Sequence, residues 1–155
     1  MRNRLALMLL VVMLGACNAP RGTLPVSPIP LRNPTYPVAS QSDVTDARLA
    51  GDWTVIEGAG VAPGTRVRFT GGSLSLGGEV SPLSRLAPGR YDTGARQLWV
   101  HWIDADNRTA AVGDPAGSQV WIMDRGGAPG ERLGAARTIL EWYGYDLARM
   151  AGRLR

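Results

Sequence analysis

The sequence predicts an all-β domain, either an antiparallel barrel or a sandwich, followed by one helix. Short apolar runs between residues 52 and 125 are separated by glycine and proline turns. Strands that recur at a spacing of roughly ten residues are typical of these two architectures. Helical periodicity is confined to a segment after Pro129, near the C-terminus.

The expected strands begin with the apolar run that contains Trp53. Pro63-Gly64, Gly71-Gly72 and Pro88-Gly89 mark turns between them. Asp104 to Asn107 form the strongest hairpin signal, because Asp and Asn accept turn conformations at low cost. The strands are expected at residues 52–58, 65–70, 73–77, 90–92 with a few residues on either side, 97–104, 108–113 and 118–125.

One amphipathic helix is expected between residues 129 and 144. Pro129 suits a first turn, where a missing N–H is tolerated, and Glu131 places negative charge near the positive end of the helix dipole. Gly144 suits a left-handed C-cap. The helix must bury its apolar stripe on the outside of the sheet; that stripe is Leu133, Ala136, Leu140 and Tyr143.

Residues 1–16 have the layout of a secretory signal: Arg2 and Arg4, then an apolar run, then small residues. The apolar run is about half the roughly 20 residues that a membrane-spanning helix needs. The small residues end at Cys17, the only cysteine of the chain. The segment Leu14-Gly15-Ala16-Cys17 resembles the lipobox of bacterial lipoproteins, which implies cleavage before Cys17 and lipidation of its thiol. The alternative is an ordinary signal peptide with an incidental cysteine.

Residues 17–44 are expected to be a lipidated, proline-rich linker, with the folded domain at residues 45–155. Six prolines fall in the linker, and proline favours an extended spacer. The formal net charge is +4, and all basic residues are arginines, spread fairly evenly along the chain. A nucleic-acid surface would need them clustered and interleaved with aromatic side chains. We therefore expect no nucleic-acid partner, and a monomer.

Two segments resemble the lipocalin family, in particular its bacterial outer-membrane lipoprotein branch. Residues 48–53, Arg-Leu-Ala-Gly-Asp-Trp, match the Gly-x-Trp signature of the first barrel strand. Residues 110–115 and 120–125, the helix, and residues 144–147 follow the family's last strands, helix and closing segment in order. The resemblance implies a small up-and-down antiparallel barrel of about 7–8 strands with the helix packed outside. The barrel is shorter than in the family, with one or two strands missing or very short between Gly60 and Gln97.

The resemblance also assigns roles to particular residues. In lipocalins the signature tryptophan lies across the barrel floor beneath an arginine of the last strand, and here the matching residues are Trp53, after Gly51, and Arg125. These are structural residues. If Arg125 reaches the floor from inside, strand alternation points other side chains of the same strand into the barrel. The expected cavity lining is Trp121, Met123, Phe69, Val67 and Trp102, although the same residues can equally fill a solid core.

No pattern in the sequence supports catalysis. His101 is the only histidine and lies in an apolar strand, where a structural role is expected. One histidine without a free cysteine cannot assemble a Cys/His pair or a transition-metal cluster. Asp104 and Asp106 lie in a turn, where backbone capping accounts for them better than acid–base chemistry. We therefore expect no enzyme, no cofactor and no metal.

The expected function is binding or transport of small hydrophobic molecules, such as fatty acids or lysolipids, in the bacterial envelope. Cys17 would anchor the protein, and Asn18 after it favours the outer membrane, facing the periplasm. Trp121 is the residue expected to touch the ligand. One alternative is a small periplasmic barrel resembling bacterial metalloprotease inhibitors, which lack the terminal helix. Another is a structural envelope lipoprotein with a filled core.

Overall fold

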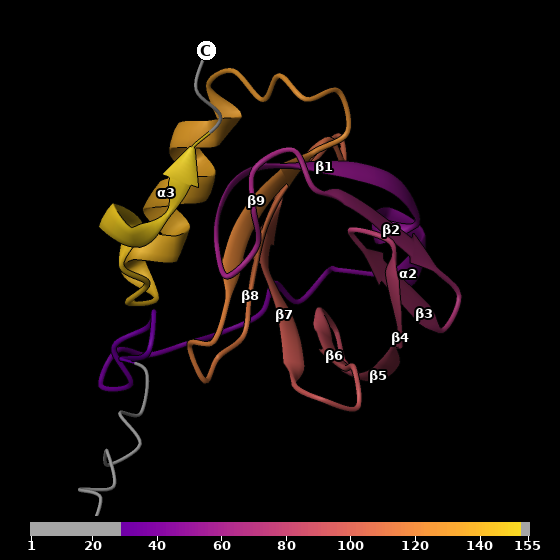
Figure 1. The fold of residues 1–155 in the computed structure, drawn as a ribbon, viewed down its shortest axis with the longest axis horizontal. Helices are drawn as coiled ribbons and strands as arrows, with labels where there is room; N and C mark the ends of the chain where they lie inside the picture. The colour runs from indigo at the N-terminus through magenta and orange to yellow at the C-terminus, as the bar shows by residue number, and fades with distance from the viewer. Residues whose placement is uncertain (1–28, 153–155) are drawn as a thin grey trace, which may run out of the picture.

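The computed structural model describes residues 29–152. The expected signal peptide, Cys17 and the first part of the linker lie outside these residues. The chain winds into one strongly curved sheet with helix α3 (Arg132–Trp142) on its outside (Figure 1). A short helix α2 (Asp46–Leu49) precedes the sheet, and a 3-10 helix η2 (Leu147–Arg149) follows α3. The strands are β1 (Gly51–Ala59), β2 (Arg66–Thr70), β3 (Ser73–Leu76), β4 (Glu79–Pro82), β5 (Ser84–Ala87), β6 (Arg90–Asp92), β7 (Gln97–Ile103), β8 (Thr109–Gly113), β9 (Val120–Asp124) and β10 (Ala151–Gly152).

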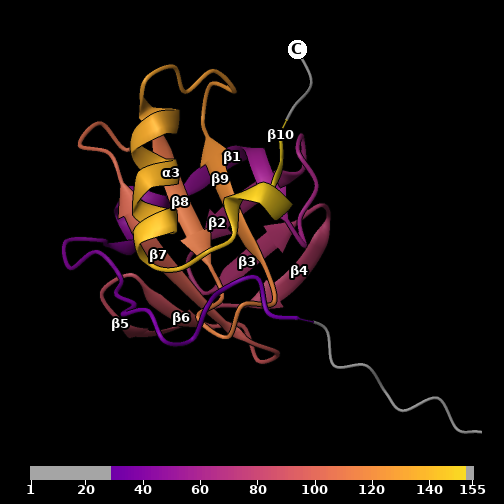
Figure 2. The same ribbon diagram turned by 90° about the vertical axis from the view of Figure 1, so that its left-hand side faces the viewer.

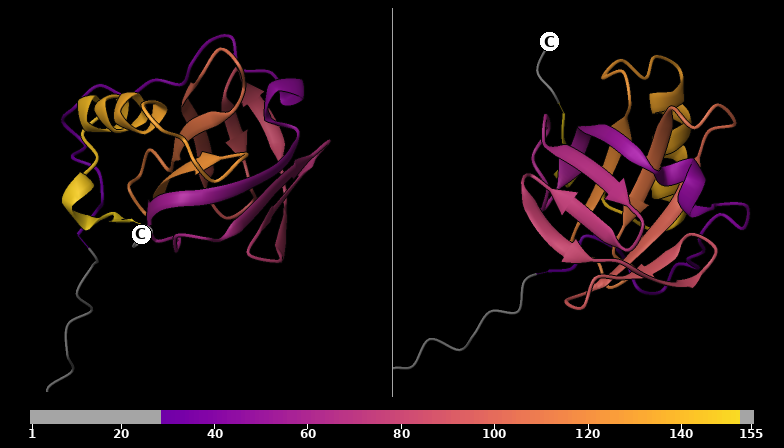
Figure 3. Two further views of the ribbon diagram at one scale, coloured as in Figure 1. Left: turned by 90° about the horizontal axis from the view of Figure 1, so that it is seen from above. Right: turned by 90° about the vertical axis from the view of Figure 1, so that its right-hand side faces the viewer.

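The sheet is a nearly closed antiparallel barrel. Its strand order is β4-β3-β2-β1-β9-β8-β7-β6-β5, so sequential strands are neighbours and β1 meets the last long strand, β9. The two ends of this order, β4 and β5, are consecutive in the chain and separated by Leu83 alone. The barrel is therefore completed by one covalent bend at Leu83, and the curvature is visible from two further sides in Figure 3. β10 pairs with the C-terminal end of β1, at Glu57 and Gly58.

The structure confirms the antiparallel barrel with one long helix near the C-terminus, and its strand count is slightly higher than expected. The difference lies at β4 and β5, in the region where strands were expected to be missing or very short. Each has four residues and shows little apolar alternation; Val80 and Leu86 are exposed. Pro82 at the end of β4 also disguises the strand, because proline is depleted in strands. Pairing with β3 and β6 holds these segments in the sheet.

Two apolar clusters lie on the two sides of the barrel wall. The inner cluster fills the barrel and includes Trp53, Tyr91 and Trp121. The outer cluster lies beneath α3 and includes Ile122 and Leu140. Figure 2 shows α3 running across β7, β8 and β9. The apolar stripe of the helix is therefore buried against the outside of the sheet.

A β-bulge in β7 overturns one predicted lining residue. The pairing of β7 with β8 shifts between Val100 and Trp102, which places an extra residue in β7. Val100 and Ile103 belong to the inner cluster, whereas Trp102 packs against the outer one. Simple alternation from Val100 would have pointed Trp102 inward. Trp102 is therefore removed from the lining.

Part of the expected linker belongs to the folded domain. Leu31 and Val44 are buried, and the Leu31 N–H donates to the carbonyl of Gly117. Further along, the Gln41 N–H donates to the carbonyl of Val100. The packed domain thus begins before the expected boundary at residue 45. The sequence did not reveal this earlier boundary, because the prolines are typical of a linker. The contacts that hold the segment come from residues that are distant in sequence.

Within residues 29–152, no helix combines the length and apolar character required to cross a bilayer.

Candidate functional site

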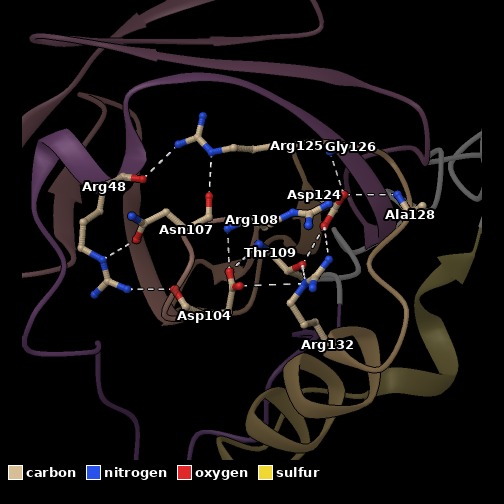
Figure 4. Close-up of polar contacts among 10 residues, drawn as sticks. All are labelled: Arg48, Asp104, Asn107, Arg108, Thr109, Asp124, Arg125, Gly126, Ala128 and Arg132. Atoms are coloured by element: carbon tan, nitrogen blue, oxygen red, sulfur yellow. Dashed lines mark hydrogen bonds and ion pairs between the residues drawn. The ribbon is translucent and has the colours of Figure 1, made fainter.

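The end of the barrel near α2 is closed by a tryptophan–arginine stack. The guanidinium carbon of Arg125 lies 3.9 Å from the ring centroid of Trp53. The Trp53 indole N–H donates to the Leu49 carbonyl at 2.8 Å. Arg125 donates to the carbonyls of Asn107 and Arg48, at 2.7 and 3.0 Å (Figure 4). These bonds tie β1, α2 and the β7–β8 turn together at one point.

Gly51 allows this stack to form. Its φ is +103°, and a Cβ placed there would lie 3.1 Å from a terminal nitrogen of Arg125. Burial lowers the pKa of Arg125, and the carboxylate of Asp52 opposes that effect. Because Arg125 is exposed on one side, its stack on the indole contributes about 0.5–1 kcal/mol. The three residues assigned to the floor are thus together in space.

Four of the five predicted lining residues lie in the inner cluster. Trp121 and Met123 are 0% exposed, and Val67 and Phe69 are nearly so. Val120 and Ile122, which alternate with Trp121 and Met123 along β9, belong to the outer cluster beneath α3. The four side chains pack against one another and against further apolar residues of the inner cluster. In this structure they form a filled interior.

The indole nitrogen of Trp121 is a polar group without a partner among the described residues of this apolar interior. Among residues 29–152 its indole nitrogen is the only buried side-chain nitrogen or oxygen without a hydrogen-bond partner. Two other tryptophans differ, because the indole N–H of Trp53 donates to the Leu49 carbonyl and that of Trp99 to the Gln97 side chain. An unpaired buried donor destabilises a fold by about 1–3 kcal/mol.

A pocket of about 220 Å³ opens beside the tryptophan–arginine stack, at the α2 end of the barrel. Its inner wall is formed by Leu49, Phe69 and Tyr91, which all belong to the inner cluster. Leu83, at the bend between β4 and β5, lines it as well. The remaining lining comes from α2 and the β2–β3 turn: Asp46, Ala47, Ala50, Thr70, Gly71 and Gly72.

Two polar side chains of this pocket, Tyr91 and Asp46, are hydrogen-bonded to each other. The Tyr91 hydroxyl donates to Oδ1 of Asp46 at 2.8 Å. Burial and this bond to a carboxylate raise the pKa of Tyr91 well above its usual value, so the hydroxyl stays protonated. The Thr70 hydroxyl is engaged with Ser73. The pocket is thus apolar inside, with a carboxylate at its rim.

Sequence reasoning found only Phe69 among the pocket residues. Asp46 and Ala47 lie in the short helix before the Gly-x-Trp signature, and Tyr91 in a three-residue strand. Alternation does point Tyr91 and Leu98, its partner in β7, toward the same face. No sequence signal could place Leu83, because its position depends on the bend that joins the two barrel edges.

A second polar group of residues anchors the start of α3. Arg132, the first residue of the helix, donates to the Thr109 hydroxyl at 2.9 Å. Its guanidinium lies 3.9 Å from carboxylate oxygens of both Asp104 and Asp124 (Figure 4). Asp104 accepts the backbone N–H groups of Arg108 and Thr109, each at 2.7 Å. These carboxylates therefore cap backbone and position a helix.

His101 is buried between the barrel wall and the N-terminal segment. Its Nδ1 lies 2.7 Å from the carbonyl of Ala39, and its Nε2 lies 2.9 Å from the Tyr145 hydroxyl. Burial lowers the pKa of His101 from 6.5 to about 4, an effect that Arg32 strengthens and the Ala39 bond opposes. In a neutral ring that donates from Nδ1 to Ala39, Nε2 is an acceptor for the Tyr145 hydroxyl, and the carbonyl of Asp114 at 3.0 Å competes for the same hydroxyl hydrogen. Within residues 29–152, no three His, Cys, Asp or Glu side chains are grouped to hold a metal ion.

Two larger hollows, of about 480 and 450 Å³, lie outside the barrel wall. Both are bordered by Leu31, Gly60 and Arg149, where the N-terminal segment passes the β1–β2 loop. The guanidinium of Arg149 donates to the carbonyls of Ile29 and Pro30 there. Loop residues make up most of their walls, and neither hollow includes a residue of the predicted lining.

Comparison with known proteins places the fold. No family model and no curated protein sequence matches this chain. Among solved structures, the chain is similar to lipocalin 12 from rat epididymis, determined in solution by NMR. The match has a TM-score of 0.56 and 11% sequence identity, and it covers 81% of this chain and 93% of the other. The fold is therefore lipocalin-like.

Proposed function

We propose that this protein binds small hydrophobic molecules and carries them within a bacterial envelope, anchored there through lipid on Cys17. The observation that carries the proposal is the pocket at the α2 end, whose inner wall is the apolar interior of the barrel. A lipocalin-like fold supports it, because barrels of about eight strands suit one small ligand. The N-terminal sequence supports export and anchoring.

The size of the pocket limits the ligand and its affinity. Ligand pockets usually measure about 300–1,000 Å³, so 220 Å³ suits a compact molecule or one end of a chain. Burying about 200 Å² of apolar ligand surface yields roughly 5 kcal/mol at about 25 cal/mol per Å². Association costs reduce that gain. Because 5 kcal/mol corresponds to a dissociation constant of about 0.2 mM, we expect dissociation constants of about 0.2 mM or weaker.

Filling the pocket from its rim tests the proposal. Ala47 is exposed and lines the pocket on α2, so Ala47→Trp should block it without disturbing the interior. We expect this variant to lose binding of the neutral fluorophore N-phenyl-1-naphthylamine by about tenfold or more, which corresponds to about 1.4 kcal/mol. The measurement is a fluorescence titration.

The matched control is Ala95→Trp, which adds the same side chain to an exposed loop between β6 and β7. Binding by the wild type and by Ala95→Trp, together with loss in Ala47→Trp, supports the pocket. Trp121→Ala tests the competing expectation that the ligand reaches Trp121 deeper in the barrel. If the wild-type protein does not bind the fluorophore, the binding function is refuted.

One observation favours a second candidate, a structural envelope lipoprotein. The interior is filled: Trp53, Val55 and Trp121 are each at most 1% exposed. For that candidate, apolar probes fail to bind and the barrel serves as a stable body on the membrane. The inhibitor-like alternative is disfavoured by α3, since bacterial metalloprotease inhibitors lack a terminal helix. A protease inhibition assay tests it directly.

A further inference from the structure

The charge around the α2-end pocket is one-sided. Asp46 is the only Asp, Glu, His or Arg side chain among its lining residues. Within residues 29–152, Asp46 forms no ion pair within 4.0 Å. Its one side-chain hydrogen bond to another side chain comes from the neutral Tyr91 hydroxyl, at Oδ1. A full negative charge thus stands at the mouth of an apolar pocket.

Three arginines of the surrounding elements, Arg48, Arg85 and Arg125, are engaged elsewhere, and Arg125 donates to the carbonyls of Asn107 and Arg48. Arg48 pairs with Asp43 at 2.6 Å and donates to Asn107. Arg85 donates to the carbonyl of Val44 at 3.4 Å, and its charge lowers the pKa of Tyr91 slightly against the dominant effects of burial and Asp46. None of the three arginines lines the pocket. Among the described residues, no cationic side chain therefore belongs to the pocket lining to receive an acidic headgroup.

The hydrogen-bonding side chains of the pocket act mainly as acceptors. The Tyr91 hydroxyl proton is already given to Asp46, and the Thr70 hydroxyl is paired with Ser73. The second carboxylate oxygen of Asp46 and the lone pairs of the Tyr91 oxygen are left to accept. A ligand that brings an N–H or O–H group matches this arrangement. A carboxylate ligand would face the like charge of Asp46 and side chains that act mainly as acceptors.

We propose that the pocket selects apolar molecules that end in a hydrogen-bond donor, an amine or a hydroxyl, and discriminates against fatty acids. This inference rests on the proposed function and names the class of its ligand. The apolar part of the ligand enters between Leu49, Phe69 and Leu83, and the donor remains at the rim beside Asp46. Free fatty acids, the ligands expected from the resemblance, are the class that this rim disfavours.

Three ligands of one chain length test the proposal: octylamine, octanol and octanoate, each competing with N-phenyl-1-naphthylamine at pH 7 and low salt. An ion pair with a solvent-accessible carboxylate contributes up to about 1 kcal/mol, or about fivefold in affinity. We expect octylamine to bind about two- to fivefold more tightly than octanol, and octanoate to bind most weakly. The preference for the amine should shrink as salt is added, because ions screen exposed charges.

Asp46→Asn is the decisive variant. An asparagine keeps an oxygen for the Tyr91 hydroxyl and removes the charge, so octylamine and octanol should bind it equally. The matched control is Asp106→Asn, which removes the same charge from an exposed turn between β7 and β8. We expect the control to keep the order of the wild type. Equal thermal unfolding of the three proteins excludes misfolding as the cause.

The outcomes distinguish a failure of this inference from a failure of the proposed binding function. If the neutral fluorophore and all three ligands fail to bind the wild type, the binding function is refuted. If the fluorophore binds but octanoate is the tightest competitor, the selection for donors is refuted and the binding function stands. The selection for donors is likewise refuted if Asp46→Asn keeps the wild-type order.

Discussion

At the scale of single residues, the fold depends on polar side chains that have matched hydrogen-bond partners. Trp53 and Arg125 are held by three hydrogen bonds to backbone carbonyls. The two ring nitrogens of His101 likewise have partners, the carbonyl of Ala39 and the hydroxyl of Tyr145. Trp121 is the exception among the described residues, with an unpaired indole nitrogen in an apolar interior.

The buried histidine predicts a pH dependence of stability. Because the pKa of His101 falls from 6.5 to about 4 on folding, the unfolded chain binds more protons between these values. Stability is therefore full above pH 6.5 and is lost as the pH falls toward 4, by about 3 kcal/mol at most. Urea unfolding at pH 7 and pH 4.5 measures this loss.

The variant His101→Gln isolates the contribution of the ring. Carboxylates also titrate near pH 4, so the wild type and the variant are compared at both values. We expect the variant to lose less stability than the wild type on acidification. An equal loss in both proteins would show that His101 does not protonate on unfolding.

At the scale of elements, α3 is held mainly by its ends and by two buried side chains. Ala136 and Leu140 are the residues of the helix that are fully buried. Arg132 anchors its start through Thr109, Asp104 and Asp124. Gly144 follows its end with a φ of +84°, packed against the Cβ of Tyr36. The helix begins and ends within a few residues of the expected bounds, because cap residues are local signals.

Two glycines near α3 predict opposite effects of the same substitution. Gly134 lies within the exposed face of the helix, and a Cβ there meets nothing within 4 Å. We expect Gly134→Ala to stabilise the protein by about 0.5–1 kcal/mol, because alanine loses less backbone entropy. Gly144→Ala should destabilise it, because the added Cβ would lie 2.8 Å from that of Tyr36. Chemical denaturation of both variants measures the difference, and equal effects would contradict the cap.

At the scale of the whole molecule, the barrel is closed by one pairing and one bend. β1 and β9 join the first and last long strands, and Leu83 joins the two edges β4 and β5. The N-terminal segment reaches both sides of the barrel wall, because Leu31 belongs to the outer cluster and Val44 to the inner one. The proposed anchor, Cys17, precedes this segment in the sequence, and the proposed pocket lies in the barrel domain.

The anchoring proposal predicts lipid on one residue. Cells grown with an alkyne-tagged fatty acid should yield labelled wild-type protein, and Cys17→Ser should carry no label, since the chain has no other cysteine. Asn18→Ala is the control, because it alters the neighbouring residue and keeps the thiol. Labelled Cys17→Ser, or unlabelled wild type, would refute lipidation at this position.

Much of the fold could be predicted because its signals are local. Alternation in β2 reports which face is buried. β9 is buried on both faces, and there the pair Val120/Trp121 divides correctly between the outer and inner clusters. Alternation fails at Trp102, because a bulge resets it and bulges have no fixed sequence pattern. It also misses β4 and β5, which are exposed on both faces.

The candidate site was predicted less well, because a pocket is made by residues distant in sequence. Phe69 follows from alternation in β2, but Asp46, Leu83 and Tyr91 meet it only through the closure of the barrel. Residue type and spacing alone specify most of the strands and the outer helix, since each of these has a local signal, whereas the Trp53–Arg125 floor was expected from the resemblance to lipocalins. The position of the pocket and the charge beside it follow from the folded chain, because both depend on how the two edges of the sheet meet.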